Sequence, residues 1–305
     1  MALSSPSKRA LLIAGPTASG KSAIAAELAG RVNGVLINAD ALQVYGALRV
    51  LSARPSAAEE ARLPHRLFGH VGATERYSVG RWLEDVAPVL DTVWAAGQCP
   101  VLVGGTGLYF KALEEGLAPV PDVPQTVRDR VAAWHAGEGE EGLRRRLPEG
   151  EVQELDHHRL IRALEVWEAT GRSLKDWQQE RSTPLLSGAH VARAFLMPDR
   201  EVAYARCEER FDEMLATGAL DEVRALLELA LDPDLPVMKA IGVSELSLHL
   251  AGELTLDDAS VLAKTQTRRY VKRQMTWFRS QMPGWPPVAP EAAAERLLTD
   301  LQSQG

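Results

Sequence analysis

The chain has 305 residues, of which 46% are hydrophobic and 25% charged, and its formal net charge is −7. This is the composition of a soluble globular protein with one large or two smaller domains. It argues against a membrane protein, because no apolar run approaches the ~18–20 residues that span a bilayer. It also argues against a protein that coats nucleic acid non-specifically, although a phosphate backbone responds to local charge rather than to the total. Cys99 and Cys207 lie far apart and predict neither a disulfide framework nor a zinc site, so we expect a cytoplasmic protein.

The N-terminal part alternates short apolar runs with amphipathic segments, the pattern of a parallel sheet covered by helices. We expect strands over 10–15, 34–40 and 100–105, a weaker strand over 65–71, and helices over 21–31, 81–97 and 106–116.

The amino-acid composition changes after Gly116, where a proline-rich stretch leads into charged helical segments. A returning strand over 194–199 would make residues 117–190 an insertion, and long helices over 201–218, 220–230 and 257–282 follow to the end. The expected fold is a P-loop NTPase-like α/β core, formed by residues 1–116 and 191–305, with an inserted all-helical domain and a helical C-terminal part.

The first strand runs directly into GPTASGKS (15–22), which has the G-x-x-x-x-G-K-S spacing of a phosphate-binding loop. In such a loop, backbone N–H groups and the helix N-terminus face the anion, Lys21 adds a charge, and Ser22 is the hydroxyl on the Mg²⁺ side. The candidate phosphate-binding residues are Gly15, Pro16, Thr17, Ala18, Ser19, Gly20, Lys21 and Ser22. The loop serves a nucleotide such as ATP or any other pyrophosphate ester, so it does not identify the ligand.

Asp40, in NADALQVY (38–45), ends the expected neighbouring strand, at the edge where ligands of open α/β sheets gather. Its carboxylate could hold Mg²⁺ or act as a general base, or it could simply cap a helix. No other strand resembles a Walker-B strand, since PVLVGG (100–105) ends in glycines. That pattern disfavours an ordinary NTPase.

A second glycine-rich turn lies in VGGTGLYFKAL (103–113), where small residues would let the backbone approach a substrate and Thr106 would offer a hydroxyl. A purely structural turn is the alternative.

Basic residues gather in AKTQTRRYVKRQMTWFR (263–279), which contains no acid and includes Trp277 and Phe278. We interpret it as a helix with one packed face and one anion-binding face. The helix start DHHRLIR (156–162) is read as solvated or RNA-facing rather than metal-binding, because adjacent histidines do not share a helix face.

Together these motifs resemble the tRNA dimethylallyltransferase family, also called tRNA isopentenyltransferase, over roughly residues 9–282. The matching motifs are GPTASGKS, D-x-x-Q-V-Y (40–45), HRL (65–67), LVGGTGLYFKAL (102–113), HRLIRALEVWEATG (158–171), TRRYVKRQMTWFR (267–279) and, more loosely, KAIGVSEL (239–246).

The resemblance implies transfer of a dimethylallyl group from dimethylallyl diphosphate to the N6 amine of adenosine 37, in the anticodon stem-loop of tRNAs reading codons that begin with U. Pyrophosphate leaves, held with Mg²⁺ by the phosphate loop. Asp40 would take the proton, Thr106 would lie beside the adenine, and Arg210 would lie near the diphosphate. Positions matching tRNA contacts are Asp40, Ala41, Leu42, Gln43, Thr106, Arg128, His158, Arg159, Leu160, Ile161 and Arg162, and the basic helix adds Lys272 and Arg273.

The chain departs from the family pattern at Ala41, usually serine, at Arg54, usually lysine, and at VSE (243–245), usually Y-K-E. These departures concern base positioning rather than the reaction class. Two other functions are considered: a small-molecule or nucleoside kinase, which would leave 263–279 unused, and an RNA-binding protein with a nucleotide switch, which needs a second metal-binding aspartate that the sequence lacks. We expect a monomer.

Overall fold

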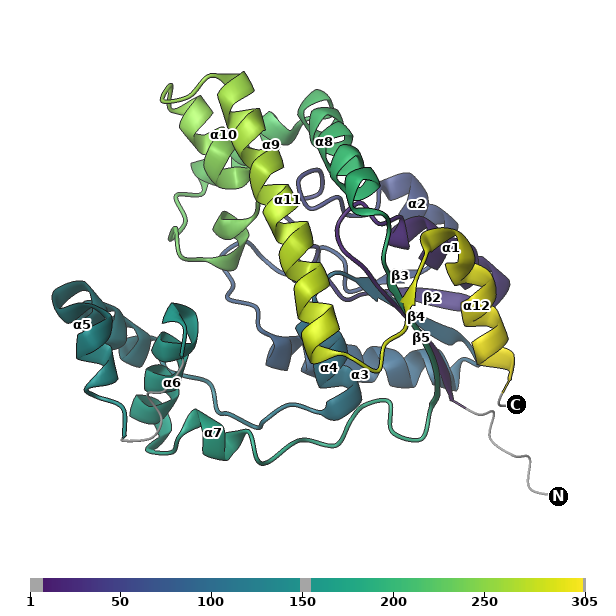
Figure 1. The fold of residues 1–305 in the computed structure, drawn as a ribbon, viewed down its shortest axis with the longest axis horizontal. Helices are drawn as coiled ribbons and strands as arrows, with labels where there is room; N and C mark the ends of the chain where they lie inside the picture. Colours follow the sequence, from purple (N-terminus) through teal and green to yellow (C-terminus); the bar gives the residue numbers. More distant parts are fainter. Residues whose placement is uncertain (1–7, 149–154, 304–305) are drawn as a thin grey trace. The chain divides into compact units, whose positions relative to one another are not determined.

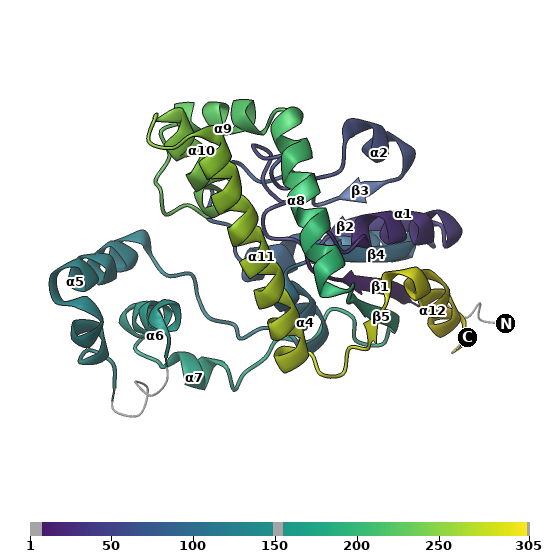
Figure 2. The ribbon, with the colours of Figure 1, turned by 45° about the horizontal axis from the view of Figure 1, so that its top comes forward.

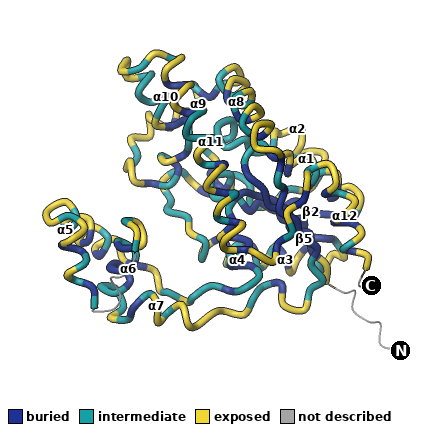
Figure 3. Tube along the Cα trace, in the orientation of Figure 1, coloured by how far each residue is buried: buried dark blue, intermediate teal, exposed yellow. Residues whose placement is uncertain are grey.

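The computed structural model describes residues 8–148 and 155–303, which contain one six-stranded parallel sheet in the order β3-β2-β4-β1-β5-β6 (Figure 1). The strands are β1 (Arg9–Ala14), β2 (Gly34–Asn38), β3 (His65–Arg66), β4 (Cys99–Gly104), β5 (His190–Leu196) and β6 (Pro287–Val288). Strands β1, β2 and β4 are buried along almost their whole length, as Figure 3 shows for the centre of the sheet. Near-continuous apolar strands of this kind are typical of a parallel sheet covered on both faces, and the expected α/β class is confirmed.

The helices of the core are α1 (Lys21–Arg31), α2 (Ala57–Arg62), α3 (Val79–Ala95), α4 (Gly107–Glu115), α8 (Arg200–Ala216), α9 (Ala219–Glu228), α10 (Val243–Leu250), α11 (Leu256–Gln281) and α12 (Pro290–Gln302). Helices α1 and α12 pack side by side on one face of the sheet, where Leu28 and Leu297 join Leu11 and Ile13 of β1 in a buried cluster (Figure 2). The long helix α11 crosses the carboxyl edge of the sheet region and packs along α8 (Figures 1 and 2).

The chain divides into a core unit, up to Glu114 and from Leu186 onward, and a helical unit over Glu115–Leu185. The helical unit contains α5 (Gln125–Arg144), α6 (His157–Thr170) and α7 (Leu174–Trp177), packed around its own apolar cluster. Its two ends are joined, because Ser182 N–H donates to Leu117 O at 2.9 Å and Leu117 N–H donates to Ser182 Oγ at 3.1 Å.

Several expected element bounds are wrong. The fifth strand is His190–Leu196 rather than 194–199, because its first residues alternate between half-buried and buried and so hide its start. It ends early because Asp199 accepts hydrogen bonds from Glu201 and Val202 N–H and starts α8. The strand expected over 65–71 shortens to the two residues of β3. Strand β6 and helix α12 were not expected from the sequence.

The sequence suggested that the strand ending before Asp40 is the neighbour of β1. The structure shows that it is not. β2 pairs with β3 and β4, and β4 lies between β2 and β1. The end of β4 therefore separates the phosphate loop from Asp40. No helix of the described ranges is both long and apolar enough to cross a bilayer.

Candidate active site

The phosphate loop lies between the end of β1 at Ala14 and the start of α1 at Lys21, as the spacing predicts. Gly20 adopts a left-handed backbone with φ of 82°, and Ala18 does the same with φ of 58°. A Cβ on Gly15 would lie 2.6 Å from Ser19 Oγ and 3.1 Å from Leu196 Cβ, so a side chain there would require both neighbours to move. Ser19 Oγ is buried and has no hydrogen-bond partner among the described residues.

Lys21 is almost completely buried, and its Nζ donates to Pro16 O at 3.2 Å. Burial lowers the pKa of Lys21 to about 8, with the Asp40 carboxylate opposing this shift and the Arg210 guanidinium adding to it. A buried ammonium beside a second cation is unfavourable without an anion. The loop is therefore prepared for a negatively charged ligand. Ser22, which follows on the first turn of α1, is exposed.

Arg210 lies on α8, and it is close enough to the phosphate loop for its charge to affect the pKa of Lys21. Burial lowers its pKa, while Cys207 and then Asp40 raise it. Within the described part of the chain, Arg210 forms no ion pair closer than 4.0 Å. A second cation is thus available to the ligand of the phosphate loop.

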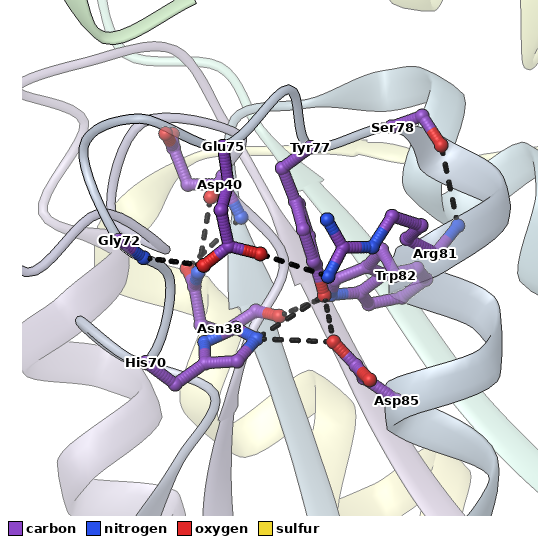
Figure 4. A network of polar contacts seen from close by, with 10 residues as sticks. All are labelled: Asn38, Asp40, His70, Gly72, Glu75, Tyr77, Ser78, Arg81, Trp82 and Asp85. Atoms are coloured by element: carbon purple, nitrogen blue, oxygen red, sulfur yellow. Dashed lines mark hydrogen bonds and ion pairs between the residues drawn. The ribbon is translucent and has the colours of Figure 1, made fainter. Parts of the chain in front are cut away.

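Asp40 is held at the end of β2 by its neighbour Asn38, which is fully buried. Asn38 Nδ2 donates to Asp40 O at 3.0 Å, and Asp40 N–H donates to Asn38 Oδ1 at 2.9 Å. Trp82 Nε1 fixes Asn38 in turn by donating to its backbone oxygen at 2.9 Å (Figure 4). Asp40 Oδ1 accepts from Leu42 N–H at 3.0 Å. Asp40 stabilises a turn, and no helix begins there, so the expected alternative of a helix N-cap is wrong.

The turn from Asp40 to Gln43 is tied to the second glycine-rich motif. Thr106 Oγ1 accepts from Ala41 N–H at 2.9 Å, and Thr106 N–H donates to Ala39 O at 3.3 Å. Gln43 Nε2 donates to Ser52 O and Ala53 O, both at 3.0 Å. Both amide protons of Gln43 are therefore bonded to backbone oxygens of the 52–53 turn.

The glycines of VGGTG serve packing, which is the structural alternative that the sequence left open beside close approach to a substrate. A Cβ on Gly104 would lie 2.0 Å from Ala39 O, and one on Gly107 would lie 2.1 Å from Trp277 Cζ3. A Cβ on Gly105 would lie 2.3 Å from Gln274 Nε2. These glycines allow β2 and α11 to approach the end of β4.

Two tyrosines complete the surroundings of Asp40. Burial, followed by the charge of Asp40, raises the pKa of Tyr109 and of Tyr270. Tyr109 stacks on Trp82 with ring centroids 4.5 Å apart, and Arg273 lies over the ring of Tyr270 at 5.6 Å. Sequence reasoning counted Tyr270 only as apolar surface, because nothing in the pattern showed that it faces Asp40.

A polar network on α3 and the loop before it also escaped the sequence analysis (Figure 4). Tyr77 Oη donates to Asp85 Oδ2 at 2.5 Å, and His70 Nε2 lies 3.2 Å from each of these oxygens. Glu75 forms an ion pair with Arg81 at 3.0 Å. The network fixes the segment that leads to Trp82, and thereby the support of Asn38.

The basic helix α11 has the packed face that its sequence predicts and an exposed face opposite, for which anion binding stays a prediction. Gln274 and Phe278 are buried, whereas Lys272 and Arg273 are exposed. Neither of these two cations forms an ion pair with an acid that the structure describes. Lys264 and Arg268 differ, because each forms an ion pair with an acid of α8.

The remaining expected RNA contacts lie in the helical unit. Arg128 and Arg162 flank Glu165, with nitrogen–oxygen distances of 3.9 and 3.6 Å. Burial lowers the pKa of Arg162. His158–Arg159 is exposed, but Leu160 is fully buried in the core of this unit. Apolar periodicity turns the Leu160 side chain inward, so a contact of this position with RNA would have to be made by its backbone.

Comparison with known proteins identifies the family. The model of the IPP transferase family matches residues 43–281, and that of the isopentenyl transferase family matches residues 8–68. The chain belongs to the IPP transferase family.

Two similar relatives are tRNA dimethylallyltransferases. That of Nitrobacter hamburgensis is 51% identical over 94% of this chain and 93% of its own, and that of Azorhizobium caulinodans is 48% identical over 96% of each. The crystal structure of the full-length tRNA isopentenylpyrophosphate transferase of Bacillus halodurans is 28% identical, with a TM-score of 0.70 over 97% of both chains. The family is a class of prenyltransferases, so the protein is a transferase.

Proposed function

We propose that the protein transfers the dimethylallyl group of dimethylallyl diphosphate to the N6 amine of adenosine 37, in tRNAs that read codons beginning with U. The observation that supports this most directly is the position of Asp40 across the end of β4 from the phosphate loop: a Cβ on Gly105 would lie 3.3 Å from Asp40 Oδ2 and 3.3 Å from Gly15 O. Burial lowers the pKa of Lys21 and of Arg210, and the charge of Asp40 opposes this shift in both. The phosphate-binding loop would hold the leaving diphosphate, and the Asp40 carboxylate opposite it would accept the proton.

On the donor side, the residues stabilise negative charge that grows on the leaving group. The donors would be Arg210, the loop N–H groups and Lys21, which is held by Pro16 O. The loss of one such donor typically costs ~3 kcal/mol of transition-state stabilisation. Burial of Lys21 strengthens its attraction for the diphosphate.

Magnesium fits the same site as a partner of the diphosphate. The described residues contain no cluster of three His, Cys, Asp or Glu side chains that could cage a metal. Mg²⁺ accepts oxygen ligands and commonly keeps waters beside substrate phosphates, so the Ser22 hydroxyl, the diphosphate and water would hold it. When bound, it would neutralise part of the leaving-group charge.

On the acceptor side, the N6 amine is a poor nucleophile, because its lone pair is delocalised into the adenine ring. As the bond from N6 to C1 forms and the bond from C1 to oxygen breaks, the nitrogen becomes acidic and its proton passes to Asp40. The bond from Leu42 N–H holds Asp40 Oδ1 in place and leaves Oδ2 to take that proton. The adenine must leave its stack to arrive here, at a cost of ~a few kcal/mol.

Residues outside the reaction site would bind the tRNA. The exposed pair Lys272 and Arg273 on α11 and the exposed His158–Arg159 of the helical unit would meet phosphates of the anticodon stem-loop. We further propose that the protein acts as a cytoplasmic monomer.

The test is incubation with labelled dimethylallyl diphosphate, Mg²⁺ and unmodified tRNA that has adenosines at 36–38. Label should enter the RNA. Asp40→Asn, which retains an acceptor for Leu42 N–H, should lower the rate by ~10²–10⁴-fold, the usual worth of a general base, and leave donor binding intact. Asp91→Asn is the matched control, because its side chain is 76% exposed and on α3.

Two results would contradict the proposal. Consumption of ATP without labelling of RNA would favour the kinase alternative. Full activity of Asp40→Asn would remove Asp40 from the reaction and leave the proton acceptor to another group.

A further inference from the structure

A single glutamine on α11 joins the phosphate loop to the end of β4. Gln274 is 6% exposed and lies between Val271 and Phe278 on the buried face of the helix. Its Oε1 accepts from Thr17 N–H at 3.1 Å, and its Nε2 donates to Gly105 O at 2.9 Å. Both partners are backbone groups, one in each glycine-rich motif.

The contact lies where the elements of the candidate site meet. The Cβ position of Gly105 would be 2.3 Å from Gln274 Nε2, 3.3 Å from Asp40 Oδ2 and 3.3 Å from Gly15 O. The amide of Gln274, the free oxygen of Asp40 and the start of the phosphate loop thus surround one peptide unit. A change in the side chain at 274 acts on all three.

Packing alone does not explain a glutamine at this position. Its neighbours on the buried face are apolar, and burying an amide is unfavourable unless its hydrogen bonds are made. Both ends of the Gln274 amide bond to backbone groups, so the buried amide has its hydrogen bonds made. Thr17 directly precedes Ala18, whose backbone is left-handed, so the bond to Thr17 N–H anchors the loop next to this turn.

We propose that Gln274 is a positioning residue: it sets the spacing between the phosphate loop and Asp40 by holding the Thr17 and Gly105 peptides. This inference rests on the proposed function, in which that spacing aligns C1 of the donor with the N6 amine. Gln274 touches neither reacting atom in this account. Its role is to keep the phosphate loop and Asp40 at a fixed distance from each other. A displacement of about 1 Å can lower a rate ~10²-fold.

The first test replaces Gln274 by methionine, which is also unbranched and of similar length but cannot form the two bonds. The labelled-donor assay should show kcat lowered ~10–100-fold, with the dissociation constant of dimethylallyl diphosphate changed less than about threefold, since most loop donors remain. Gln281→Met makes the same replacement at an exposed position of α11 and should behave as the parent protein.

Gln274→Glu separates positioning from packing, because its carboxylate still accepts from Thr17 N–H but cannot donate to Gly105 O. Exchange of the Thr17 N–H should stay near the parent rate in this variant, and faster exchange would mean that packing rather than this bond holds the loop. The added charge beside Asp40 Oδ2 should move the acidic limb of the rate profile to higher pH, since like charges at one site resist ionisation, so kcat is compared on the plateau.

Hydrogen exchange gives a readout that does not depend on transfer. The Thr17 N–H should exchange faster in Gln274→Met than in the parent protein, measured on the peptide covering residues 15–20, because its acceptor is removed. Unchanged exchange, or an unchanged kcat in a folded Gln274→Met variant, would overturn the assignment. If the parent protein labels no RNA, the proposed function fails, while the exchange result still decides whether Gln274 holds the loop.

Discussion

Lys21 is buried beside Arg210 before any ligand arrives, and this gives the phosphate loop a pH dependence. Its pKa of about 8 in the folded protein lies below the 10.5 of the unfolded chain. Between these values the unfolded chain holds a proton that the folded protein lacks. The folded state is therefore stabilised as pH rises through this window, and the penalty for burying the charge is complete below pH about 8.

Donor binding should reverse this shift, since a bound diphosphate favours the charged ammonium. At pH 9 we predict that binding of dimethylallyl diphosphate takes up a large fraction of one proton, and at pH 7 almost none. Calorimetry in two buffers of different ionisation enthalpy measures this uptake directly.

The matched variant is Lys21→Arg, whose guanidinium does not titrate in this range. It should retain some donor binding but lose the proton uptake at pH 9. Equal uptake by both proteins would assign the titration to another group.

At the scale of elements, the contact between α4 and α11 depends on a missing side chain at Gly107. Gly107→Ala would place a Cβ 2.1 Å from Trp277 Cζ3. We predict that it lowers the free energy of unfolding by ~1–3 kcal/mol, as overpacking does in a close-packed interior. Urea denaturation measures the loss.

Gly30→Ala is the control for that substitution. Gly30 lies inside α1, and a Cβ there would meet nothing within 4 Å. Alanine is the better helix former by ~0.5–1 kcal/mol, so this variant should be slightly more stable than the parent. Destabilisation of both variants would mean that glycine-to-alanine changes act here through something other than the Trp277 contact.

The exposed face of α11 leads to a prediction about salt. Changing Lys272 and Arg273 together to alanine should weaken tRNA binding and reduce the slope of its logarithmic salt dependence by ~1–2, because the slope falls by about one for each phosphate that the protein no longer neutralises. Filter binding across a salt series measures the slope.

The control removes the same number of charges from the same helix. Lys264 and Arg268 already pair with Asp212 and Glu208 of α8, so their double alanine variant should change the slope much less. An identical decrease in both variants would mean that tRNA senses only the total charge of α11.

How far the sequence predicts the molecule depends on the range of each signal. The strand, loop and helix around GPTASGKS follow from local spacing, and the structure has them at the expected residues. Asp40 could be predicted as a site residue, but the strand β4 between it and the loop could not, since pairing order is set by tertiary packing. Gln274 offered one faint signal, because a polar residue stands at helical spacing between the apolar and buried Val271 and Phe278.

At the scale of the whole molecule, the helical unit should be separable from the core. Its entry at Leu117 and its exit at Ser182 are hydrogen-bonded to each other, and it has its own apolar cluster. Replacing 118–181 by a short Gly-Ser turn should leave thermal unfolding of the core nearly unchanged and preserve donor binding. Transfer to tRNA should fall below detection.

Calorimetry with dimethylallyl diphosphate measures donor binding, and a melting curve measures the thermal stability of the core. The matched control places the same Gly-Ser turn between Gly252 and Glu253, in the turn between α10 and α11, with the helical unit retained. Transfer by the shortened protein at the parent rate would mean that the helical unit does not hold the RNA.

The pairing of β1 with β5 has a consequence for synthesis on the ribosome. β1 ends at Ala14 and forms hydrogen bonds with a strand that begins at His190. At a translation rate of ~5–20 residues per second, the first strand waits on the order of ten seconds or more for its partner. The phosphate loop therefore lies beside an open sheet edge in the nascent chain, and the helical unit is made, and can fold, within that interval. Pairing of β1 with β5 brings together two central strands that are far apart in the sequence. Until it occurs, the free edge of β1 can pair with other chains, so aggregation is favoured while the protein is being made.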